Sequence, residues 1–279
     1  MAPTEVTVDR PFAASTVLTD QGGGRFTAEL GTMFTIGGKA HGGLLMVLLA
    51  KAALARLSAE HGGDIELDPV VVGTEFLRAP ELGTVELATD VLKLGRQASV
   101  AAARMTQGGR LLLSATVTAG TLPDTDPSWL AGSTMPLEPP ADAIDVVPEV
   151  RTPGEGLAAA TEARFDPATM AFLREETADP VVRGWLRPRG EDPDPLFALF
   201  AGDALPPTVF NRGGGRGWAP TVQLTAALRA RPAPGWLALE SRSVMIAGAW
   251  FDEDCTVRDA TGRVVCQARQ LALSPLPRA

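Results

Sequence analysis

The sequence predicts an α+β protein in which one unit, a helix followed by a meander of long antiparallel strands, occurs twice in tandem. Two observations lead to this prediction. Short motifs rich in glycine and proline return at a nearly constant distance along the 279 residues, and each half places an apolar helical segment ahead of segments rich in Val, Leu and Thr. Self-similarity at one fixed offset indicates architecture more reliably than any single local propensity.

Four markers define the repeat. The marker residues and their counterparts in the second half are Pro80 and Pro232, Gly83 and Gly235, Gly109 and Gly262, and Leu122 and Leu276. Their separations are 152, 152, 153 and 154 residues. Because the offset drifts so little across a whole domain length, we infer a duplicated domain.

Each half has the same predicted order of elements. The apolar helices cover residues 43–57 and 195–205. The long strands are predicted at 65–77, 84–94, 98–106 and 110–121 in the first half and at 221–230, 237–247, 250–258 and 263–273 in the second, with shorter strands at 26–30, 158–165 and 181–186. Alternating apolar residues and glycine-containing turns support these strands.

These elements divide the chain into three parts. We expect an N-terminal unit of residues 1–122, a proline-rich linker of residues 123–156 and a C-terminal unit of residues 157–279. In each unit an antiparallel sheet should wrap a central helix, because the helix is apolar and needs to be buried. This layout is the hotdog fold, so the sequence predicts a tandem, or double, hotdog.

Composition and charge restrict the function. The net charge is −8 and the isoelectric point is near 4.9, so no basic surplus is available to neutralise nucleic-acid phosphates. The N-terminus lacks a signal-peptide pattern, and the longest apolar run, residues 43–57, contains Lys51 and Arg56 and is too short for a bilayer. We expect a cytoplasmic protein without membrane insertion, in which the thiols of Cys255 and Cys266 are reduced and face each other across a hairpin.

Several motifs resemble the thioesterase-like superfamily, and most closely its type II acyl-CoA thioesterases. The motifs are HGG at 41–43, FLRAP at 76–80, GRQAS at 95–99, QGGR at 107–110, PT at 220–221, WL at 236–237 and VVCQARQ at 264–270. No single motif is specific, but their order and spacing extend over nearly the whole chain.

This resemblance implies hydrolysis of acyl-CoA thioesters, a role in fatty acid metabolism and no cofactor. By similarity, Asp203, Thr221 and Gln270 position the hydrolytic water, and the backbone amide of Gly43 stabilises the oxyanion. The chain departs from the family pattern in two ways: the second half lacks HGG, and the first helix lacks the acidic residue that usually follows HGG.

Elementary chemistry supports a site at these residues. The first amides of a helix have no partner within the helix, so Gly42 and Gly43 suit the binding of a developing negative charge. An alternative interpretation is that these glycines only let the helix and the sheet approach closely. Asp203 falls on the buried stripe of the second predicted helix, in its last turn, where burial should raise the pKa of a carboxyl. The alternative is a solvated Asp203, or one that caps the turn at Pro206.

The remaining two polar residues have alternatives of their own. Gln270 shares strand parity with Cys266 and Ala268, so it should point at the core, where a water shared with Asp203 would satisfy its amide. It could equally be an ordinary hydrogen-bonded core glutamine. Thr221 has the parity of polar neighbours, which also fits a solvent-facing position.

The substrate-binding candidates are His41 and Gly42 beside the oxyanion site, and Arg78 and Arg96 for the phosphates of an acyl-CoA. No metal site is expected, because the sequence has only two histidines and scattered acidic residues.

Three functions remain open at this stage. The leading hypothesis is acyl-CoA hydrolysis by an activated water at the interface of the two halves, with one competent site per chain. The alternatives are an enoyl-CoA hydratase or dehydratase, which should offer a His-plus-acid pair, and a non-catalytic protein that binds acyl-CoA or lipid. A homo-oligomer of double hotdogs is also plausible, because sheet edges need covering.

Overall fold

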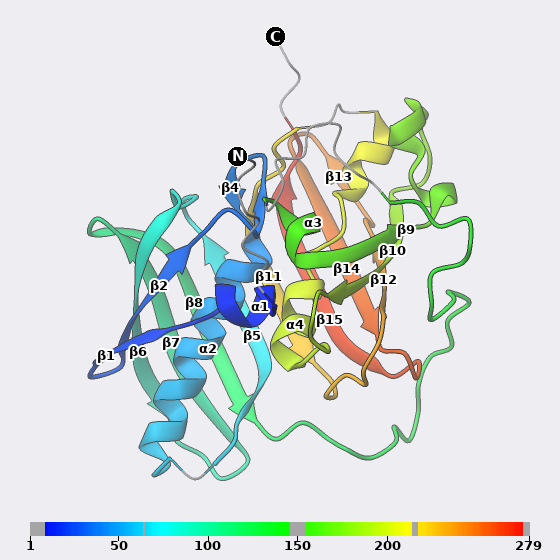
Figure 1. The fold of residues 1–279 in the computed structure, drawn as a ribbon. Coiled ribbons are helices and arrows are strands. Elements are labelled where there is room, and N and C mark those ends of the chain that lie inside the picture. Colours follow the sequence, from blue (N-terminus) through cyan, green and yellow to red (C-terminus); the bar gives the residue numbers. More distant parts are fainter. Residues whose placement is uncertain (1–8, 64, 146–154, 214–216, 276–279) are drawn as a thin grey trace, which may run out of the picture.

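The computed structural model describes residues 9–63, 65–145, 155–213 and 217–275. The two halves lie side by side, the first on the left of Figure 1 and the second on the right. In the left half the strands curve around one long helix, and a much shorter helix lies next to it at the junction. The predicted α+β tandem is therefore confirmed.

The first half supplies six strands to one antiparallel sheet, in the order β1-β2-β6-β7-β8-β5. The second half continues this sheet in the order β11-β15-β14-β12-β10-β9, and β13 pairs with β14. The bounds are β1 (Thr19–Gly22), β2 (Arg25–Leu30), β5 (Asp68–Phe76), β6 (Gly83–Lys93), β7 (Ala98–Gln107), β8 (Arg110–Gly120), β9 (Thr161–Phe165), β10 (Val181–Pro188), β11 (Thr221–Leu228), β12 (Leu237–Arg242), β13 (Ile246–Ala247), β14 (Trp250–Arg258) and β15 (Val264–Leu273). The second order repeats the first in reverse, as expected for two copies joined edge to edge.

The halves join where β5 pairs with β11. Gly73 lies opposite Thr225 in this antiparallel pair. These residues are 152 positions apart, the separation of the sequence markers, so the pseudo-twofold axis of the molecule passes between them. Both strands also have a register irregularity at corresponding places, just after Pro69 and just after Thr221. The duplication therefore extends to the β-bulges.

The long helix α2 (Gly42–Glu60) confirms the predicted helix 43–57 and extends it at both ends. It is preceded by a small hairpin of β3 (Thr35–Ile36) and β4 (Lys39–Ala40). Length and composition alone would allow α2 to cross a membrane, but 61% of its most apolar window is buried inside the fold. A helix that is apolar on all sides is expected at the centre of such a sheet.

The short helix α4 (Pro195–Ala201) ends four residues before the predicted limit of residue 205. Its start is capped by the Asp194 side chain, which accepts from the Phe197 amide at 2.7 Å. After its end the amides of Gly202, Asp203 and Ala204 bond to carbonyls three residues back, and Gly202 packs so closely that a Cβ there would lie 3.0 Å from the Ala268 Cβ on β15. The prediction that Asp203 lies in the last turn of this helix is therefore wrong, since Asp203 comes two residues after the helix ends.

Two predicted strands are interrupted. The segment 237–247 divides into β12 and β13, because the Asp252 carboxylate binds the amides of Val244 and Met245 and turns the chain there. The segment 158–165 begins with one helical turn, α3 (Leu157–Ala160), before β9. A short helix α1 (Pro11–Ser15) lies over the start of α2 in Figure 1.

The two cysteines do not lie opposite each other as predicted. Cys255 pairs with Ala268, and Cys266 pairs with Val257, so the hairpin register differs by two residues from the expected one. The turn accounts for one residue of this difference, since Arg258 pairs with Val264, and a register irregularity next to Val257 accounts for the other. Both thiols are free and buried.

The described part of the linker has no regular strand or helix but is held against the second half. Met135 packs on Trp185, and the Trp185 indole donates to the carbonyl of Pro136 at 2.8 Å. Ile144 forms an isolated bridge with Phe165. Residues 146–154 of the predicted linker lie outside the described residues.

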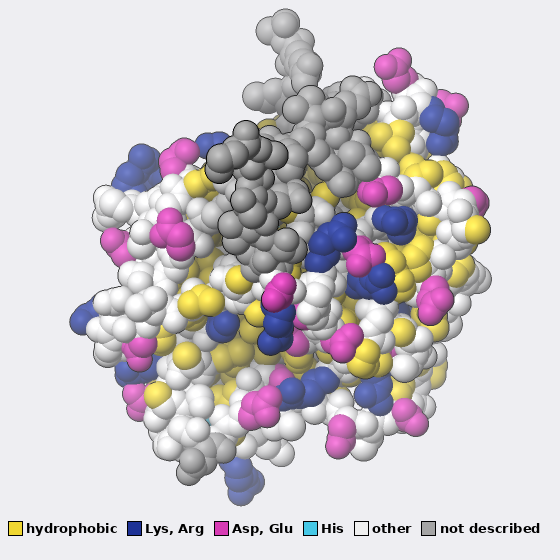
Figure 2. Space-filling model, viewed as in Figure 1, with side chains coloured by type: hydrophobic (Ala, Val, Ile, Leu, Met, Phe, Trp, Pro, Cys, Tyr) yellow, Lys and Arg dark blue, Asp and Glu magenta, His cyan; other side chains and the backbone are white. Residues whose placement is uncertain are grey.

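Acidic and basic side chains are interspersed on the face shown in Figure 2, with no large area of one sign. Ion pairs also join neighbouring strands, for example Arg183 with Glu240 at 2.7 Å and Arg187 with Glu162 at 2.8 Å. This face offers no continuous basic surface of the kind that nucleic acids require.

Candidate active site

The start of α2 forms one wall of the candidate site. The hairpin β3–β4 leads into His41, which is the N-cap of α2 and is held by a bond from its amide to the Phe34 carbonyl at 2.9 Å. The Nδ1 atom of His41 accepts from the Gly43 amide at 3.0 Å. The proposed oxyanion donor is therefore partnered by a histidine that the sequence assigned only to substrate binding.

His41 is neutral at physiological pH. Burial lowers the pKa of His41 to about 4, opposed in part by a hydrogen bond with the backbone of Asp203. Because Nδ1 accepts a hydrogen bond, the proton of the neutral ring is on Nε2. His41 thus connects the helix start of the first half to the chain of the second half.

Asp203 lies against the glycines at the start of α2. A Cβ on Gly42 would lie 2.8 Å from Oδ2 of Asp203, and a Cβ on Gly43 would lie 2.9 Å from the Phe200 carbonyl oxygen. Only glycine allows so close an approach at these two positions. The glycines therefore permit close packing against the second half, including the candidate acid, while the oxyanion role of the Gly43 amide stays a prediction.

Asp203 is a buried carboxyl whose side chain is only 8% exposed. Its pKa is raised to about 7, mainly by burial and also by the nearby charge of Glu253, while a hydrogen bond from the Gly43 amide acts to lower it. The Nδ1 atom of His41 is 3.8 Å from Oδ2 of Asp203, but the neutral imidazole supplies no counter-charge. The carboxyl is therefore balanced between its two protonation states near neutral pH.

Thr221 and Gln270 meet on the inner face of the sheet. The Thr221 hydroxyl donates to Oε1 of Gln270 at 2.7 Å. Simple alternation would put Thr221 on the opposite face from the buried Leu224, but the bulge after Thr221 restores it to the face of its partner Ala272, which is buried. The structure thus favours the inward position of Thr221 over the solvent-facing alternative.

Glu253 is a member of this cluster that the sequence analysis missed. It is 4% exposed, and it is the cross-strand partner of Gln270. Its Oε2 accepts from Nε2 of Gln270 at 2.6 Å, and its Oε1 accepts from the Thr208 amide at 2.5 Å. A signal was available, because Glu253 alternates with the apolar residues Phe251, Cys255 and Val257 and so occupies a core position of β14.

The candidate residues fall into two sets. Asp203 of the second half lies against His41, Gly42 and Gly43 of the first half, where the two helices meet. The side chains of Thr221, Gln270 and Glu253 form one hydrogen-bonded chain, and the charge of Glu253 acts on Asp203. Such an arrangement can hold a water beside a carboxylate and face it with helix amides.

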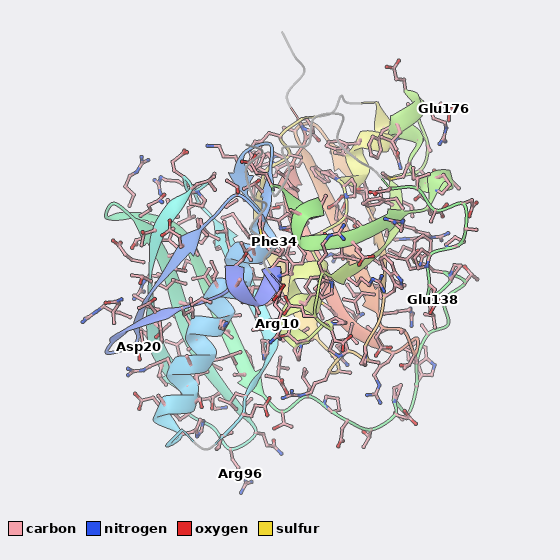
Figure 3. The ribbon with its side chains drawn as sticks, in the orientation of Figure 1. Arg10, Asp20, Phe34, Arg96, Glu138 and Glu176 are labelled. Carbon is pink, nitrogen blue, oxygen red and sulfur yellow. The ribbon has the colours of Figure 1, made fainter. Side chains whose placement is uncertain are left out.

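The two candidate arginines lie at different distances from this cluster. Arg78 lines a pocket of about 260 Å³ together with Arg110 and Gln107, only two residues beyond Phe76, whose ring contacts the Gly42 position. Arg96 lies at the opposite end of α2 from Phe34, as Figure 3 shows. A helix of 19 residues is about 28 Å long, so the structure does not bring Arg96 to the site.

No group of three or more His, Cys, Asp or Glu side chains among the described residues could hold a metal ion. The reacting groups available at the cluster are therefore carboxyls, an amide, a hydroxyl, an imidazole and backbone amides.

Comparisons with known proteins show the family of the chain. The model of the acyl-CoA thioesterase N-terminal domain matches residues 30–120, and that of the acyl-CoA thioesterase C-terminal domain matches residues 136–274. An uncharacterized protein of Mycobacterium tuberculosis is 42% identical over 266 residues, which is 90% of this chain and 91% of that protein.

Solved structures give the same result. A candidate thioesterase II from Thermobifida fusca is 34% identical with a TM-score of 0.84, covering 96% of this chain and 99% of its own. A hot dog protein of unknown function from Alicyclobacillus acidocaldarius is 19% identical with a TM-score of 0.82, covering 97% of this chain and 100% of its own. These matches confirm the predicted hotdog fold and the resemblance to type II thioesterases.

Proposed function

Because the chain belongs to the acyl-CoA thioesterase family, we propose that it hydrolyses acyl-CoA thioesters to the free acid and CoA at the junction of its two halves. The observation that carries this proposal is Asp203, a buried carboxyl with a pKa near 7 that lies against the start of α2. Stability alone would not select a carboxyl there, because burial without a counter-charge is costly.

Asp203 is the general base in this proposal. Its ionised form takes a proton from a water, and the resulting hydroxide attacks the thioester carbonyl carbon. The CoA thiolate then leaves and takes up a proton. Since the pKa of Asp203 is near 7, a large fraction of the enzyme has the base form at neutral pH, and the conjugate acid remains able to return the proton.

The start of α2 would stabilise the oxyanion. The amide of Gly43 faces this region, and the helix dipole places partial positive charge there. Because that amide is bonded to His41 Nδ1 in the structure, a substrate oxygen would have to compete with the imidazole or share the donor. In this role His41 controls access to the oxyanion donor and does not act as a base.

The pocket at Arg78 is the proposed position for the phosphates of CoA. It carries Arg78 and Arg110, and Lys39 approaches its rim through an ion pair with Glu81 at 3.1 Å. Lys39 lies two residues before His41, so this pocket is adjacent to the candidate site along the chain. Guanidinium groups bind phosphate through paired hydrogen bonds.

A second candidate function is hydration of an enoyl-CoA, and one observation favours it. The sequence analysis expected such enzymes to offer a His-plus-acid pair, and the structure has one, with His41 Nδ1 3.8 Å from Asp203 Oδ2. We rank it below hydrolysis because Nδ1 is already bonded to the Gly43 amide, which leaves the imidazole poorly placed to move a proton.

The test is a panel of acyl-CoAs from short to long chains, with released thiol measured by a chromogenic reagent. The wild type should release CoA, and Asp203→Asn should lower kcat by about 10²- to 10⁴-fold while acyl-CoA binding persists. The matched control is Asp194→Asn, since Asp194 caps the other end of α4 and asparagine caps equally well.

Three results would contradict the proposal. Hydration of an enoyl-CoA without thiol release would favour the hydratase. Binding of acyl-CoA without any turnover of the panel would favour a non-catalytic binding protein. Unchanged turnover in Asp203→Asn would show that the base is elsewhere.

A further inference from the structure

Glu253 is a second buried carboxyl at the junction, and the proposed hydrolysis leaves it without a role. It lies on β14, with its carboxylate between the Thr208 amide at the start of the 3-10 helix η3 (Thr208–Arg212) and the Gln270 side chain on β15. The Thr208 hydroxyl is itself held by the Ser243 hydroxyl at 2.6 Å. Glu253 is therefore positioned from both sides.

The charge of Glu253 determines the direction of the hydrogen bonds beside it. An ionised carboxylate only accepts, so Gln270 must turn its Nε2 atom toward Glu253, as observed at 2.6 Å. The carbonyl Oε1 of Gln270 must then face Thr221, and the Thr221 hydroxyl must donate to it, as observed at 2.7 Å. The lone pairs of the Thr221 oxygen and the second N–H of Gln270 then remain available to bind a ligand.

We infer that Glu253 is a positioning residue, which holds Gln270 and Thr221 in the orientation that receives the water activated by Asp203. This inference rests on the proposed hydrolysis and adds to it a residue that acts through others. It also accounts for Glu253 being a glutamate, since a neutral side chain of the same size would leave the direction of both hydrogen bonds undetermined.

A change in the charge of Glu253 would reverse this arrangement. Protonated Glu253 can donate to Oε1 of Gln270, and the amide would then rotate and offer its N–H groups to Thr221. Thr221 would become an acceptor and would direct its own proton elsewhere. The donors and acceptors seen by the water would be exchanged, so we expect turnover to require the ionised form.

Glu253 also acts on Asp203 through its charge. Its negative charge raises the pKa of Asp203, in addition to the effect of burial. The other titratable groups near the two carboxyls are His41, which faces Asp203, Asp252 on the same strand as Glu253, and Cys255, whose pKa is raised by burial. Of these, His41 and Cys255 are neutral at pH 7. Burial raises the pKa of Glu253 itself to about 7, against the hydrogen bonds from Thr208 and Gln270 that lower it, so its ionised form is populated at neutral pH and predominates above it.

Two variants of Glu253 test the effect of its charge and the effect of its side-chain length separately. Glu253→Gln keeps the size but removes the charge, and we expect kcat to fall about 10- to 100-fold with KM little changed. The acidic limb of the pH–rate profile should also move to lower pH, because Asp203 loses a neighbouring negative charge. Glu253→Asp keeps the charge but is too short to bind Gln270, so kcat should fall without a comparable move of that limb.

The matched control is Asp254→Asn. Asp254 is the next residue on β14 and faces the other side of the sheet, where it pairs with Arg269 at 2.7 Å. Removing its charge should leave both kcat and the pH profile unchanged. A second measurement does not depend on turnover: ¹³C NMR of the labelled Asp203 carboxyl should show it titrating at lower pH in Glu253→Gln than in the wild type.

The outcomes are distinguishable from those of the proposed function. If the wild type hydrolyses acyl-CoAs but Glu253→Gln retains its kcat and its pH profile, the inference is wrong and the proposed function stands. If the wild type hydrolyses no acyl-CoA, the proposed function fails, and the Asp203 titration still decides the coupling. An Asp203 titration that is identical in the wild type and in Glu253→Gln would overturn the charge coupling, and a kcat that is unchanged in Glu253→Gln would overturn the positioning role.

Discussion

The two halves share one backbone plan but differ in what they place on the inner face of the sheet. In the second half, one cross-strand row runs from Leu224 on β11 through Gln270 on β15 to Glu253 on β14. The symmetry-related row in the first half is Val72, Val117 and Ala101, and all three are fully buried. Two of the three positions, those of Gln270 and Glu253, are thus polar in the second half and apolar in the first.

The helices of the two halves also differ, in their length and in the groups at their ends. α2 of the first half has 19 residues and begins at HGG, whereas α4 has 7 residues and ends just before Asp203. At the sequence offset of 152, the counterpart of Asp203 is Lys51, which extends its amine to the Thr16 carbonyl at 2.7 Å. One half therefore supplies helix amides and the other supplies acid, amide and hydroxyl groups, which predicts a single site per chain.

This division explains why a duplicated fold is useful for such chemistry. Buried carboxyls destabilise a core, and the first-half row has none, because Val72, Val117 and Ala101 are all apolar. The first-half row contributes packing, while the second-half row contributes reactive groups. The following predictions test this comparison, beginning with the largest expected effect.

The first prediction concerns stability and pH. The folded pKa of Asp203, about 7, exceeds its ordinary value of 3.8, so the folded state holds the proton more tightly. The contribution of Asp203 to the free energy of unfolding is fully present below the ordinary pKa and is lost as the pH rises through about 7. Asp203→Asn should remove this loss. The difference in the free energy of unfolding between the variant and the wild type should then favour the variant more at pH 8 than at pH 4, by on the order of 4 kcal/mol.

The measurement is denaturant unfolding of the wild type and the variant between pH 4 and pH 8. Lys51→Met at the corresponding position of the first half should not reproduce the gain, because it removes no buried acid. Parallel pH dependences of the wild type and Asp203→Asn would contradict the prediction.

The second prediction concerns the close approach of the halves. A Cβ on Gly42 would lie 2.8 Å from Oδ2 of Asp203, the end of a side chain, so the carboxyl should move and the backbone should stay. Gly42→Ala should then lower kcat about 100-fold with a small loss of stability. In Gly43→Ala the Cβ meets the backbone oxygen of Phe200 at 2.9 Å, so the melting temperature should fall as well. Gly31→Ala, where nothing lies within 4 Å, is the control.

The third prediction separates the two arginines that the sequence proposed for substrate binding. Arg78→Ala should raise KM for an acyl-CoA roughly three- to tenfold, because Arg78 lines the pocket near the site. Arg96→Ala, at the far end of α2, should have no effect. With an acyl-N-acetylcysteamine thioester, which has no phosphates, both variants should match the wild type; a loss of Arg78→Ala activity on this substrate would argue against phosphate binding.

The fourth prediction has the smallest effect. Thr74 and Ala226 are counterparts across the axis, and the buried Thr74 hydroxyl finds no hydrogen-bond partner among the described residues. Thr74→Val should be neutral or stabilising by up to about 1 kcal/mol. Thr89→Val should instead destabilise by about 1 kcal/mol, since Thr89 donates to the Gly24 carbonyl at 2.8 Å. Equal changes in melting temperature would show that Thr74 is satisfied in solution.

Much of the fold could be predicted from the sequence, because its signals are local. The apolar run of residues 43–57 predicted α2, and alternating residues between glycine turns predicted the long strands to within a few residues. The end of the second helix was predicted less well. The chain there leaves the helix in a turn of i to i+3 bonds, and Gly202 packs against Ala268 on β15, a contact between residues distant in sequence.

The candidate site was predicted in part. Resemblance to type II thioesterases singled out Asp203, Thr221 and Gln270, which the structure gathers at one junction. Glu253 was overlooked although its position in an alternating buried pattern was available. The bond between His41 and the Gly43 amide could not be predicted, because the ring orientation depends on the surroundings of the N-cap.

The sequence by itself determined the duplication, the composition of each copy and the helix that begins at HGG, since these depend on periodicity and on intrinsic glycine and proline preferences. Only the tertiary structure decided which polar groups meet. A bulge after Thr221 turns that side chain inward, and strand register places Glu253 opposite Gln270. Register and bulges are properties of strand pairs, and a shift of one residue reverses the face of every side chain, so no single segment contains this information.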